Sequence, residues 1–168
     1  MKTAVFTALF IASVLVAQTI AVIDSERIFD NLGEVADAAE LLENEIMEWE
    51  AHADSLQDEI DAIEADLEYT MIMSPDRRRE RELLLEEKSA ELQDFLARTF
   101  GPDGLVESRN SELVSPIVAS INETVQEISL EEGYDIVLDT SGGLVVYVSN
   151  SIDITDMVLE KLSTGSSD

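Results

Sequence analysis

An apolar repeat between residues 39 and 70 constrains the fold of this chain more than any other feature. Its positions are separated by alternating gaps of three and four residues, and only the last is polar: Ala39, Leu42, Ile46, Trp49, Ala53, Leu56, Ile60, Ile63, Leu67 and Thr70. This spacing averages about 3.5 residues per helical turn, which is typical of a coiled-coil seam. No Gly or Pro occurs between Glu34 and Ser74. We therefore expect one long helix that depends on packing against a partner helix.

The segment that follows is expected to supply this partner. Ser74 suits the N-cap of a second helix, Pro75 its first position, and Asp76 the positive end of its dipole. Two long helices joined by so short a link fold back antiparallel. We predict a coiled-coil helical hairpin over residues 31–104, with its tip near 71–79 and arms of roughly 50 Å. The second helix has a looser apolar stripe: Leu84, Leu85, Leu92, Phe95 and Leu96.

Basic residues are few and are concentrated at this tip. The chain has 10 Lys and Arg against 37 Asp and Glu, giving a formal net charge of −27, and half of the basic residues lie between Arg77 and Lys88. They either pair with the acidic first helix or contact an anionic surface, such as lipid headgroups or lipopolysaccharide. The apolar residues before the turn either adapt to a bound surface or seal the helix ends. The candidate tip contacts are Met71, Ile72, Met73, Arg77, Arg78, Arg79 and Arg81.

A break and a third helix are expected beyond the hairpin. The Gly-Pro-Asp-Gly sequence at 101–104 predicts a kink or a short loop. Helix resumes near Leu105 and runs to about Glu131, and Pro116 within it is expected to cause a bend. Its inward stripe consists of Leu113, Ile117, Ile121, Val125 and Ile128.

The ends of the chain, residues 18–30 and 105–163, predict a small β-rich body with flanking helices. Strands are expected at 19–24, 134–139 and 144–148, the last two joined as a hairpin through a Ser-Gly-Gly turn. Thr155 is expected to cap a last helix that runs through Leu162, and residues 164–168 are expected to form a disordered tail.

So small a sheet has a consequence for assembly. Three short strands are too few for an independently stable sheet, so several copies of the chain are expected to pool their strands in one α+β body. The residues expected to form these oligomerisation strands are Ile20, Val22, Ile136, Leu138, Val145 and Tyr147.

The first 17 residues are typical of a secretory signal peptide. Lys2 provides a positive start, an apolar run extends from Ala4 to Val16, and the small residue Ala17 suits the cleavage position. The alternative is a membrane anchor, because no charged residue occurs between Lys2 and Asp24 and a span needs roughly 20 apolar residues. An exported chain without cysteine fits a bacterial envelope compartment, the periplasm.

The composition also argues against several functions. A nucleic-acid partner is not expected, because this chain has no basic face to offer phosphates. Without cysteine there is neither a disulfide scaffold nor a thiolate site, and the single histidine, His52, is expected at the solvated edge of the seam. No calcium loop or phosphate-binding glycine loop occurs. We expect no enzyme activity, no cofactor and no metal.

Several local stretches resemble the Skp/OmpH family of periplasmic chaperones for outer-membrane proteins. The segment Ile20-Ala-Val-Ile-Asp24, followed by Arg27-Ile-Phe29, is similar to that family's opening strand and helix start. Residues 131–139 resemble its second strand, and residues 151–162 its closing helix. Pro116 also falls where the family tends to place a proline, and the resemblance covers nearly the whole mature chain.

The resemblance implies a homotrimer with a body of pooled strands and three helical arms that enclose a cavity. It also implies an ATP-independent holdase that shields unfolded outer-membrane β-barrel precursors in the periplasm. The strong acidity departs from well-known members, which are often basic. The alternative function is a structural or tethering coiled-coil protein of the envelope, held by an uncleaved N-terminus.

Overall fold

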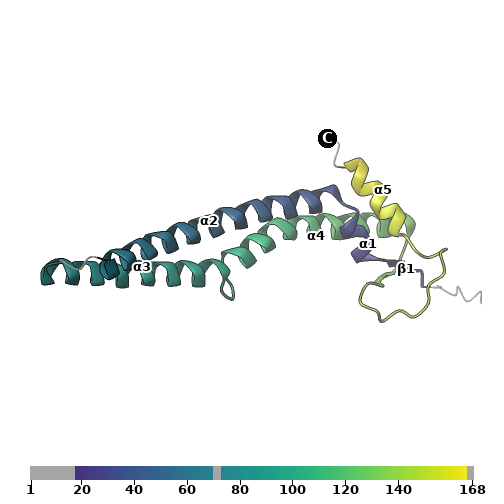
Figure 1. Ribbon diagram of the computed structural model, residues 1–168. Helices are drawn as coiled ribbons and strands as arrows, with labels where there is room; N and C mark the ends of the chain where they lie inside the picture. The colour runs from purple at the N-terminus through teal and green to yellow at the C-terminus, as the bar shows by residue number, and fades with distance from the viewer. Residues whose placement is uncertain (1–17, 70–72, 166–168) are drawn as a thin grey trace, which may run out of the picture.

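The computed structural model describes residues 18–69 and 73–165. Within this range the molecule is mostly helical, with a two-stranded sheet near one end (Figure 1). The elements in chain order are β1 (Ile20–Ile23), α1 (Ser25–Asp30), α2 (Gly33–Tyr69), α3 (Pro75–Phe100), α4 (Leu105–Glu132), β2 (Ile136–Asp139) and α5 (Thr155–Gly165). The proposed signal segment 1–17 lies outside the described residues.

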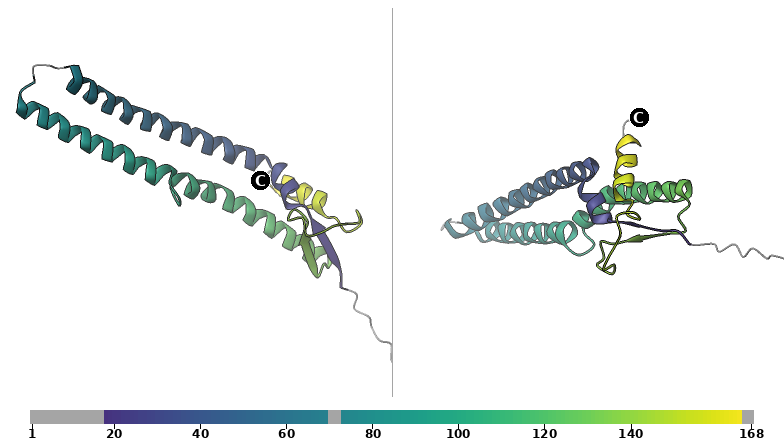
Figure 2. Two further views of the ribbon diagram at one scale, coloured as in Figure 1. Left: turned by 60° about the horizontal axis from the view of Figure 1, so that its bottom comes forward. Right: turned by 90° about the vertical axis from the view of Figure 1, so that its right-hand side faces the viewer.

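The two longest stretches of helix form the elongated part of the molecule. α2 runs outward from the body, and α3 returns beside it in the opposite direction (Figure 2). Ser74 caps α3 as expected: its Oγ accepts a hydrogen bond from the Arg77 N–H at 3.4 Å, and Pro75 is the first helical residue. The short link between Tyr69 and Pro75 therefore reverses the chain.

The apolar repeat of α2 faces the returning chain over most of its length. Leu56, Ile60 and Ile63 are buried, and the other expected positions from residue 42 to residue 67 are partly buried. Ala39 is exposed, contrary to the expectation, and Ala38 packs toward the body core in its place. The difference arises because this end of α2 contacts α4 and the body rather than α3. Thr70 lies outside the described residues.

The Gly-Pro-Asp-Gly break separates α3 from α4 as expected. Gly101 ends α3 and Gly104 precedes α4, and a Cβ at Gly101 would lie 2.2 Å from the Ala97 carbonyl oxygen. Asp103 adopts a positive φ of 57°, a conformation that Asp tolerates better than most residues. α4 then continues through Pro116 to Glu132, at the start of its course beside α2 and further on in contact with α5 and β2 (Figure 2).

The sheet differs from the expected three-stranded arrangement. β1 and β2 pair in parallel, with Ile20 opposite Ile136 and Ile23 opposite Asp139. The other edge of β1 bonds to the chain just before α5: the Val22 N–H donates to the Ile152 carbonyl at 2.8 Å, and the Ile154 N–H donates to the Val22 carbonyl at 3.0 Å. β1 is therefore the central strand of the body.

The predicted hairpin between residues 134–139 and 144–148 is wrong for the single chain. Gly143 adopts the expected turn conformation with a φ of 70°, but residues 144–148 form no strand and pair with no strand in the described structure. In the single chain β1 takes the place beside β2, and the loop that follows β2 leads back to the opposite edge of β1 at residues 152–154.

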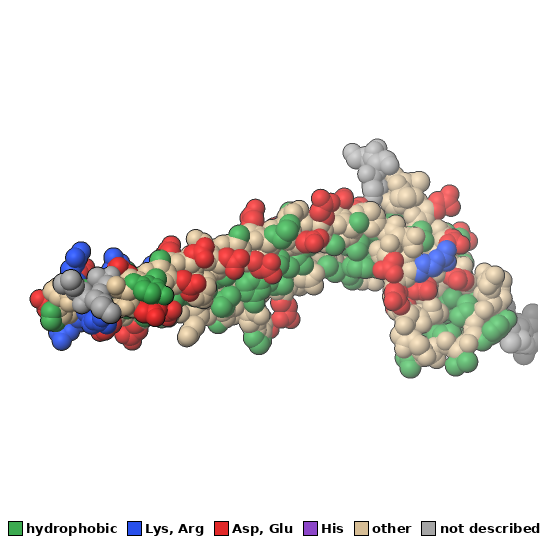
Figure 3. Space-filling model, viewed as in Figure 1, with side chains coloured by type: hydrophobic (Ala, Val, Ile, Leu, Met, Phe, Trp, Pro, Cys, Tyr) green, Lys and Arg blue, Asp and Glu red, His purple; other side chains and the backbone are tan. Residues whose placement is uncertain are grey.

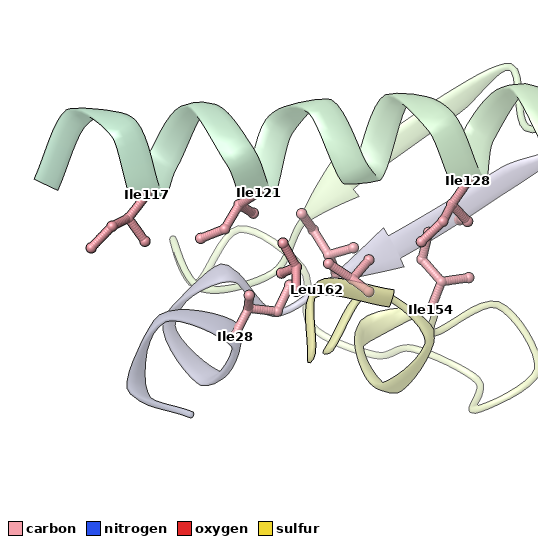
Figure 4. Packing of buried hydrophobic residues seen from close by; sticks show 9 residues of the cluster. Ile28, Ile117, Ile121, Ile128, Ile154 and Leu162 are labelled. Atoms are coloured by element: carbon pink, nitrogen blue, oxygen red, sulfur yellow. The ribbon is translucent and has the colours of Figure 1, made fainter. Parts of the chain in front are cut away.

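The core lies where α4, α1, α5 and β1 meet (Figure 4). The expected inward stripe of α4 is confirmed, since Ile117, Ile121 and Ile128 are buried. These side chains point toward α1 and α5, as Figure 4 shows. The cluster of buried residues consists of Ala21, Ile23, Ile28, Ile117, Ile121, Ile128, Ile154, Val158 and Leu162. The body thus has a small aliphatic core without a buried aromatic residue in this cluster.

α5 is capped differently and is longer than expected. Asp153, rather than Thr155, satisfies the helix start: its Oδ1 accepts from the Thr155 N–H at 2.9 Å. Thr155 is the first helical residue, and its Oγ1 accepts from the Asp24 N–H at 3.0 Å, which ties α5 to the end of β1. The helix extends to Gly165, so the first two residues of the expected tail, 164 and 165, are helical. Residues 166–168 lie outside the described residues.

Candidate functional site

The hairpin tip carries most of the positive surface of the arm (Figure 3). Of the apolar residues expected there, Met73 is partly buried beside the turn, while Met71 and Ile72 lie outside the described residues. Arg81 pairs with Asp66 of α2, Nε to Oδ2 at 3.1 Å, and Arg78 donates from Nη2 to the Leu67 carbonyl at 3.3 Å. Two of the four tip arginines thus contact the first helix.

The other two tip arginines differ in their surroundings. Arg77 and Arg79 are exposed, and neither forms an ion pair with any residue in the described part of the chain. Both stand within the first five residues of α3, next to the turn. The tip therefore combines two arginines that join the helices with two that face solvent.

Further ion pairs join the acidic α2 to the returning chain along the arm. Lys88 contacts Glu59 at 2.9 Å and Glu91 at 3.0 Å, and hydrogen bonds from these carboxylates raise the pKa of Lys88. Arg109 of α4 forms a bidentate pair with Glu45, whose two oxygens lie 2.9 Å from its Nε and Nη2. The Glu45 bond is also the main cause of the raised pKa of Arg109.

His52 lies at the edge of the seam, as expected. Its ring packs edge-on against Phe95 of α3, with the ring centroids 4.7 Å apart. The imidazole is exposed, and no other histidine occurs in the chain. This arrangement suits a packing role better than a catalytic one.

The second candidate surface is the open edge of the body. Of the six expected oligomerisation residues, Ile20, Ile136 and Leu138 are 40–45% exposed and Tyr147 is 85% exposed. Val145 is partly buried. Val22 is buried at 3% exposure in the single chain, outside the cluster that Ala21 and Ile23 of β1 form with the helices, and its place in an assembling strand stays a prediction. Its burial follows from the position of β1, which has hydrogen-bonded neighbours on both edges.

The stretch from Leu144 to Val148 is the most exposed apolar part of the described chain. Leu144 is 91% exposed and Val146 is 98% exposed, and neither contributes to the core. β-branched and aromatic residues in an extended, unpaired segment provide a ready edge for strand addition. An exposed apolar stretch of this kind is typical of a surface that contacts another protein.

A polar junction beside this segment was missed by the sequence reasoning. Asp139, the last residue of β2, accepts hydrogen bonds from the backbone and hydroxyl groups of both Ser25 and Ser141. Partial burial opposes ionisation of Asp139, but these bonds outweigh it and lower its pKa to about 2. The three residues are 114 and 2 positions apart in the chain, so only the fold brings them together.

A cavity of about 690 Å³ opens next to this junction. It lies between α1, α4 and the loop after β2, and its apolar walls include Phe29, Val118, Val125 and Val137. The sequence offered no signal for it other than the amphipathic stripe of α4. Ser25, Asp139 and Ser141 of the polar junction are among its lining residues.

No group of His, Asp or Glu side chains within residues 18–69 and 73–165 is arranged to hold a metal ion. Among the helices described, none combines the length and apolar character that crossing a bilayer requires.

Comparison with known proteins gives a consistent result. Residues 19–162 match the family described as outer membrane protein (OmpH-like). A protein named Chaperone protein Skp from Pectobacterium atrosepticum is 29% identical over 155 residues, covering 90% of this chain and 89% of the relative. A protein of the same name from Yersinia enterocolitica is 29% identical over 150 residues, covering 87% of each.

A solved structure extends the comparison to the fold. The crystal structure of an OmpH-like protein from Caulobacter crescentus CB15 superposes with a TM-score of 0.76 at 16% identity, covering 98% of this chain and 90% of that one. At this identity the likeness concerns the fold. The family match includes both the helical arm and the body, and this chain belongs to the OmpH-like family.

Proposed function

We propose that this protein is an ATP-independent periplasmic chaperone that holds unfolded outer-membrane β-barrel precursors and prevents their aggregation. The observation that carries the proposal is the family match over residues 19–162, which includes arm and body together. The relatives named as Skp chaperones support the chaperone role. An unfolded barrel precursor exposes alternating apolar strands, and a binding surface between helical arms can screen these strands without any chemistry.

The proposed assembly is a homotrimer in which bodies join and arms surround a cavity. Supporting it is the exposed apolar edge formed by Ile136, Leu138 and Tyr147 together with the unpaired segment 144–148. In this proposal a strand from one copy adds to this edge of the next copy, and the head-to-tail contact closes into a ring of three when each copy is rotated by a third of a turn. In this proposal residues 18–30 and 105–163 form the assembling body and residues 31–104 the larger part of the arm.

We also propose that the hairpin tip contacts either the client or an anionic surface such as lipid headgroups or lipopolysaccharide. Arg77 and Arg79 are the residues available for this role, since Arg78 and Arg81 are already engaged with α2. The test compares Arg77→Ala/Arg79→Ala with Arg78→Ala/Arg81→Ala for binding to anionic vesicles. We expect weaker binding only in the first pair, and a lower melting temperature mainly in the second.

Suppression of aggregation tests the chaperone function directly. A urea-unfolded outer-membrane β-barrel protein is diluted into buffer of low salt, with or without this protein in equimolar amount, and light scattering is followed. We expect scattering to fall strongly without added nucleotide. An acidic monomeric protein of similar size serves as the control for nonspecific effects of charge. Unchanged scattering in the presence of the assembled protein contradicts the proposal.

A further inference from the structure

A groove of about 400 Å³ runs between α2 and α4 where the arm joins the body. Its walls are largely aliphatic, and Leu41 in one of them is 43% exposed although it is a large apolar side chain. The lining residues are Glu34, Asp37, Ala38, Leu41, Leu113, Pro116 and Ile117. The groove is thus apolar inside and has two carboxylates along the α2 side.

The two helices that form the groove are acidic, and within the described residues neither carries a Lys or Arg side chain without an ion-pair partner. α2 carries fourteen Asp and Glu residues and neither Lys nor Arg over its whole length. The only Lys or Arg in α4 is Arg109, and Glu45 and Glu112 already bind its guanidinium at 2.8–2.9 Å. Asp37 forms no ion pair with any residue that the structure describes. Figure 3 shows the same pattern, since acidic side chains intersperse the hydrophobic surface along the arm.

Pro116, one of the lining residues, also changes the backbone hydrogen bonding of α4 next to the groove. Because proline has no N–H, the carbonyl of Glu112, four residues earlier in α4, lacks its usual helical donor. This carbonyl lies on the helix face next to the Pro116 ring, which lines the groove. A backbone acceptor without its helical N–H donor, close to Asp37 across the groove, favours a ligand that brings N–H donors or positive charge.

We infer that this groove binds cationic apolar segments of unfolded polypeptide, in which Lys or Arg flank large apolar residues. The apolar side chain would fill the groove beside Leu41, and the neighbouring cation would lie near Asp37 and the Glu112 carbonyl. An anionic segment with the same apolar residues would meet only like charge on α2. The inference rests on the proposed chaperone function and names its preferred client segments by charge.

Two labelled peptides provide the test. Both have the same alternating Leu, Val and Phe residues, and they carry either Lys or Glu at the intervening positions. Fluorescence anisotropy with the full assembled protein measures their binding at about 0.1 M and about 1 M salt, between which the screening length falls from about 10 Å to about 3 Å. We expect the Lys peptide to bind at least about tenfold more tightly at low salt, and high salt to remove most of this difference.

Matched variants locate the binding. Asp37→Asn is expected to weaken Lys-peptide binding about threefold, as loss of one surface charge contact does, while Asp54→Asn has little effect. Asp54 is an exposed acid of the same helix outside the groove, so it controls for net charge. Leu41→Ser is expected to weaken both peptides, and Leu83→Ser, a change at an exposed leucine of α3, to weaken neither. Circular dichroism melting confirms that each variant folds.

The outcomes separate this inference from the proposed function. If the protein suppresses aggregation but binds both peptides equally, or if Asp54→Asn acts as strongly as Asp37→Asn, the inference is overturned and the chaperone proposal stands. If Leu41→Ser changes only the molar mass in solution, the groove is occupied by a second copy and the inference is again overturned. If the peptides do not bind and aggregation is not suppressed, both proposals fail.

Discussion

At the scale of single residues, small polar side chains connect the parts of the body. Asp139 receives hydrogen bonds from Ser25 at the start of α1 and from Ser141 in the turn after β2. The Thr155 hydroxyl accepts a hydrogen bond from the Asp24 N–H and donates one to the Asp153 carboxylate. The latter bond is the main reason that the pKa of Asp153 is lowered. These bonds hold the C-terminal end of β1 in place against elements more than 110 residues away.

The lowered pKa of Asp139 predicts a specific dependence of stability on pH. Its folded value of about 2 lies below the usual 3.8, so the ionised form stabilises the fold above about pH 4, and this contribution is lost as the pH falls toward 2. Asp139→Asn should therefore lower the free energy of unfolding at pH 7 by about 1 kcal/mol, after allowance for solvent exposure. Urea unfolding at pH 7 and at pH 3 measures the change.

The exposed Asp54 provides the control for this prediction. Asp54→Asn should leave the decrease in the free energy of unfolding between pH 4 and pH 2 unchanged. Asp139→Asn should make this decrease smaller. A variant at residue 139 with the same acid sensitivity as the original protein would contradict the assigned role of this carboxylate.

At the scale of elements, the arm is a set of helices whose ends are defined by local chemistry. Ser74 and Pro75 begin α3, and Gly101 and Gly104 flank the break before α4. These signals act on neighbouring residues, so the sequence predicted them well. The sequence did not predict that β1 would pair with β2 and that residues 144–148 would stay unpaired. A strand edge can bond to any extended segment, and local patterns do not select the partner.

At the break between α3 and α4, the addition of a single methyl group should lower the stability of the fold substantially. Gly101→Ala would place a Cβ 2.2 Å from the Ala97 carbonyl oxygen, a backbone atom that cannot easily move. We expect a loss of about 1–3 kcal/mol in the free energy of unfolding, which is the range for overpacking. Gly33→Ala at the start of α2 meets no atom within 4 Å and should be neutral or slightly stabilising. Thermal melting of both variants checks this; equal melting temperatures would contradict the close approach.

At the scale of the whole molecule, a long acidic arm is attached to a body with a small core and an open apolar edge. The core cluster comprises nine buried residues, and large apolar side chains such as Leu144, Val146 and Tyr147 remain in solvent. Such a body gains most from burying its open edge against further copies. The acidic charge acts against this assembly by mutual repulsion.

The open edge predicts how self-association responds to substitution. A charge at Val146, which is 98% exposed in the single chain, should disrupt a contact between copies without disturbing the core. We expect Val146→Asp to lower the molar mass measured by light scattering coupled to gel filtration from that of a trimer to that of a monomer. Leu130→Asp, at an exposed position of α4, is the control and should retain the original mass. The same mass for both variants and the original protein would contradict an interface at this edge.

The net charge of −27 predicts that salt stabilises the assembled protein. Raising the salt concentration from about 0.1 M to about 1 M shortens the screening length from about 10 Å to about 3 Å, which weakens repulsion among the α2 carboxylates. We expect both the melting temperature and the fraction assembled to increase with NaCl. Sucrose controls for general exclusion from the protein surface, and a protein equally stable at both salt concentrations would contradict this prediction.

The sequence by itself determined the long helices, their reversal at Ser74, the break at 101–104 and the inward stripe of α4. Helical periodicity, caps and glycines act over a few neighbouring residues, so they can be interpreted without a fold. Only the tertiary structure decided that β1 is central, that Val22 is buried in the single chain, and that Asp139 meets Ser25. It also decided that α2 and α4 enclose an apolar groove beside Asp37. These features depend on which distant segments pack together, and that choice is made by the burial of apolar surface over the whole chain.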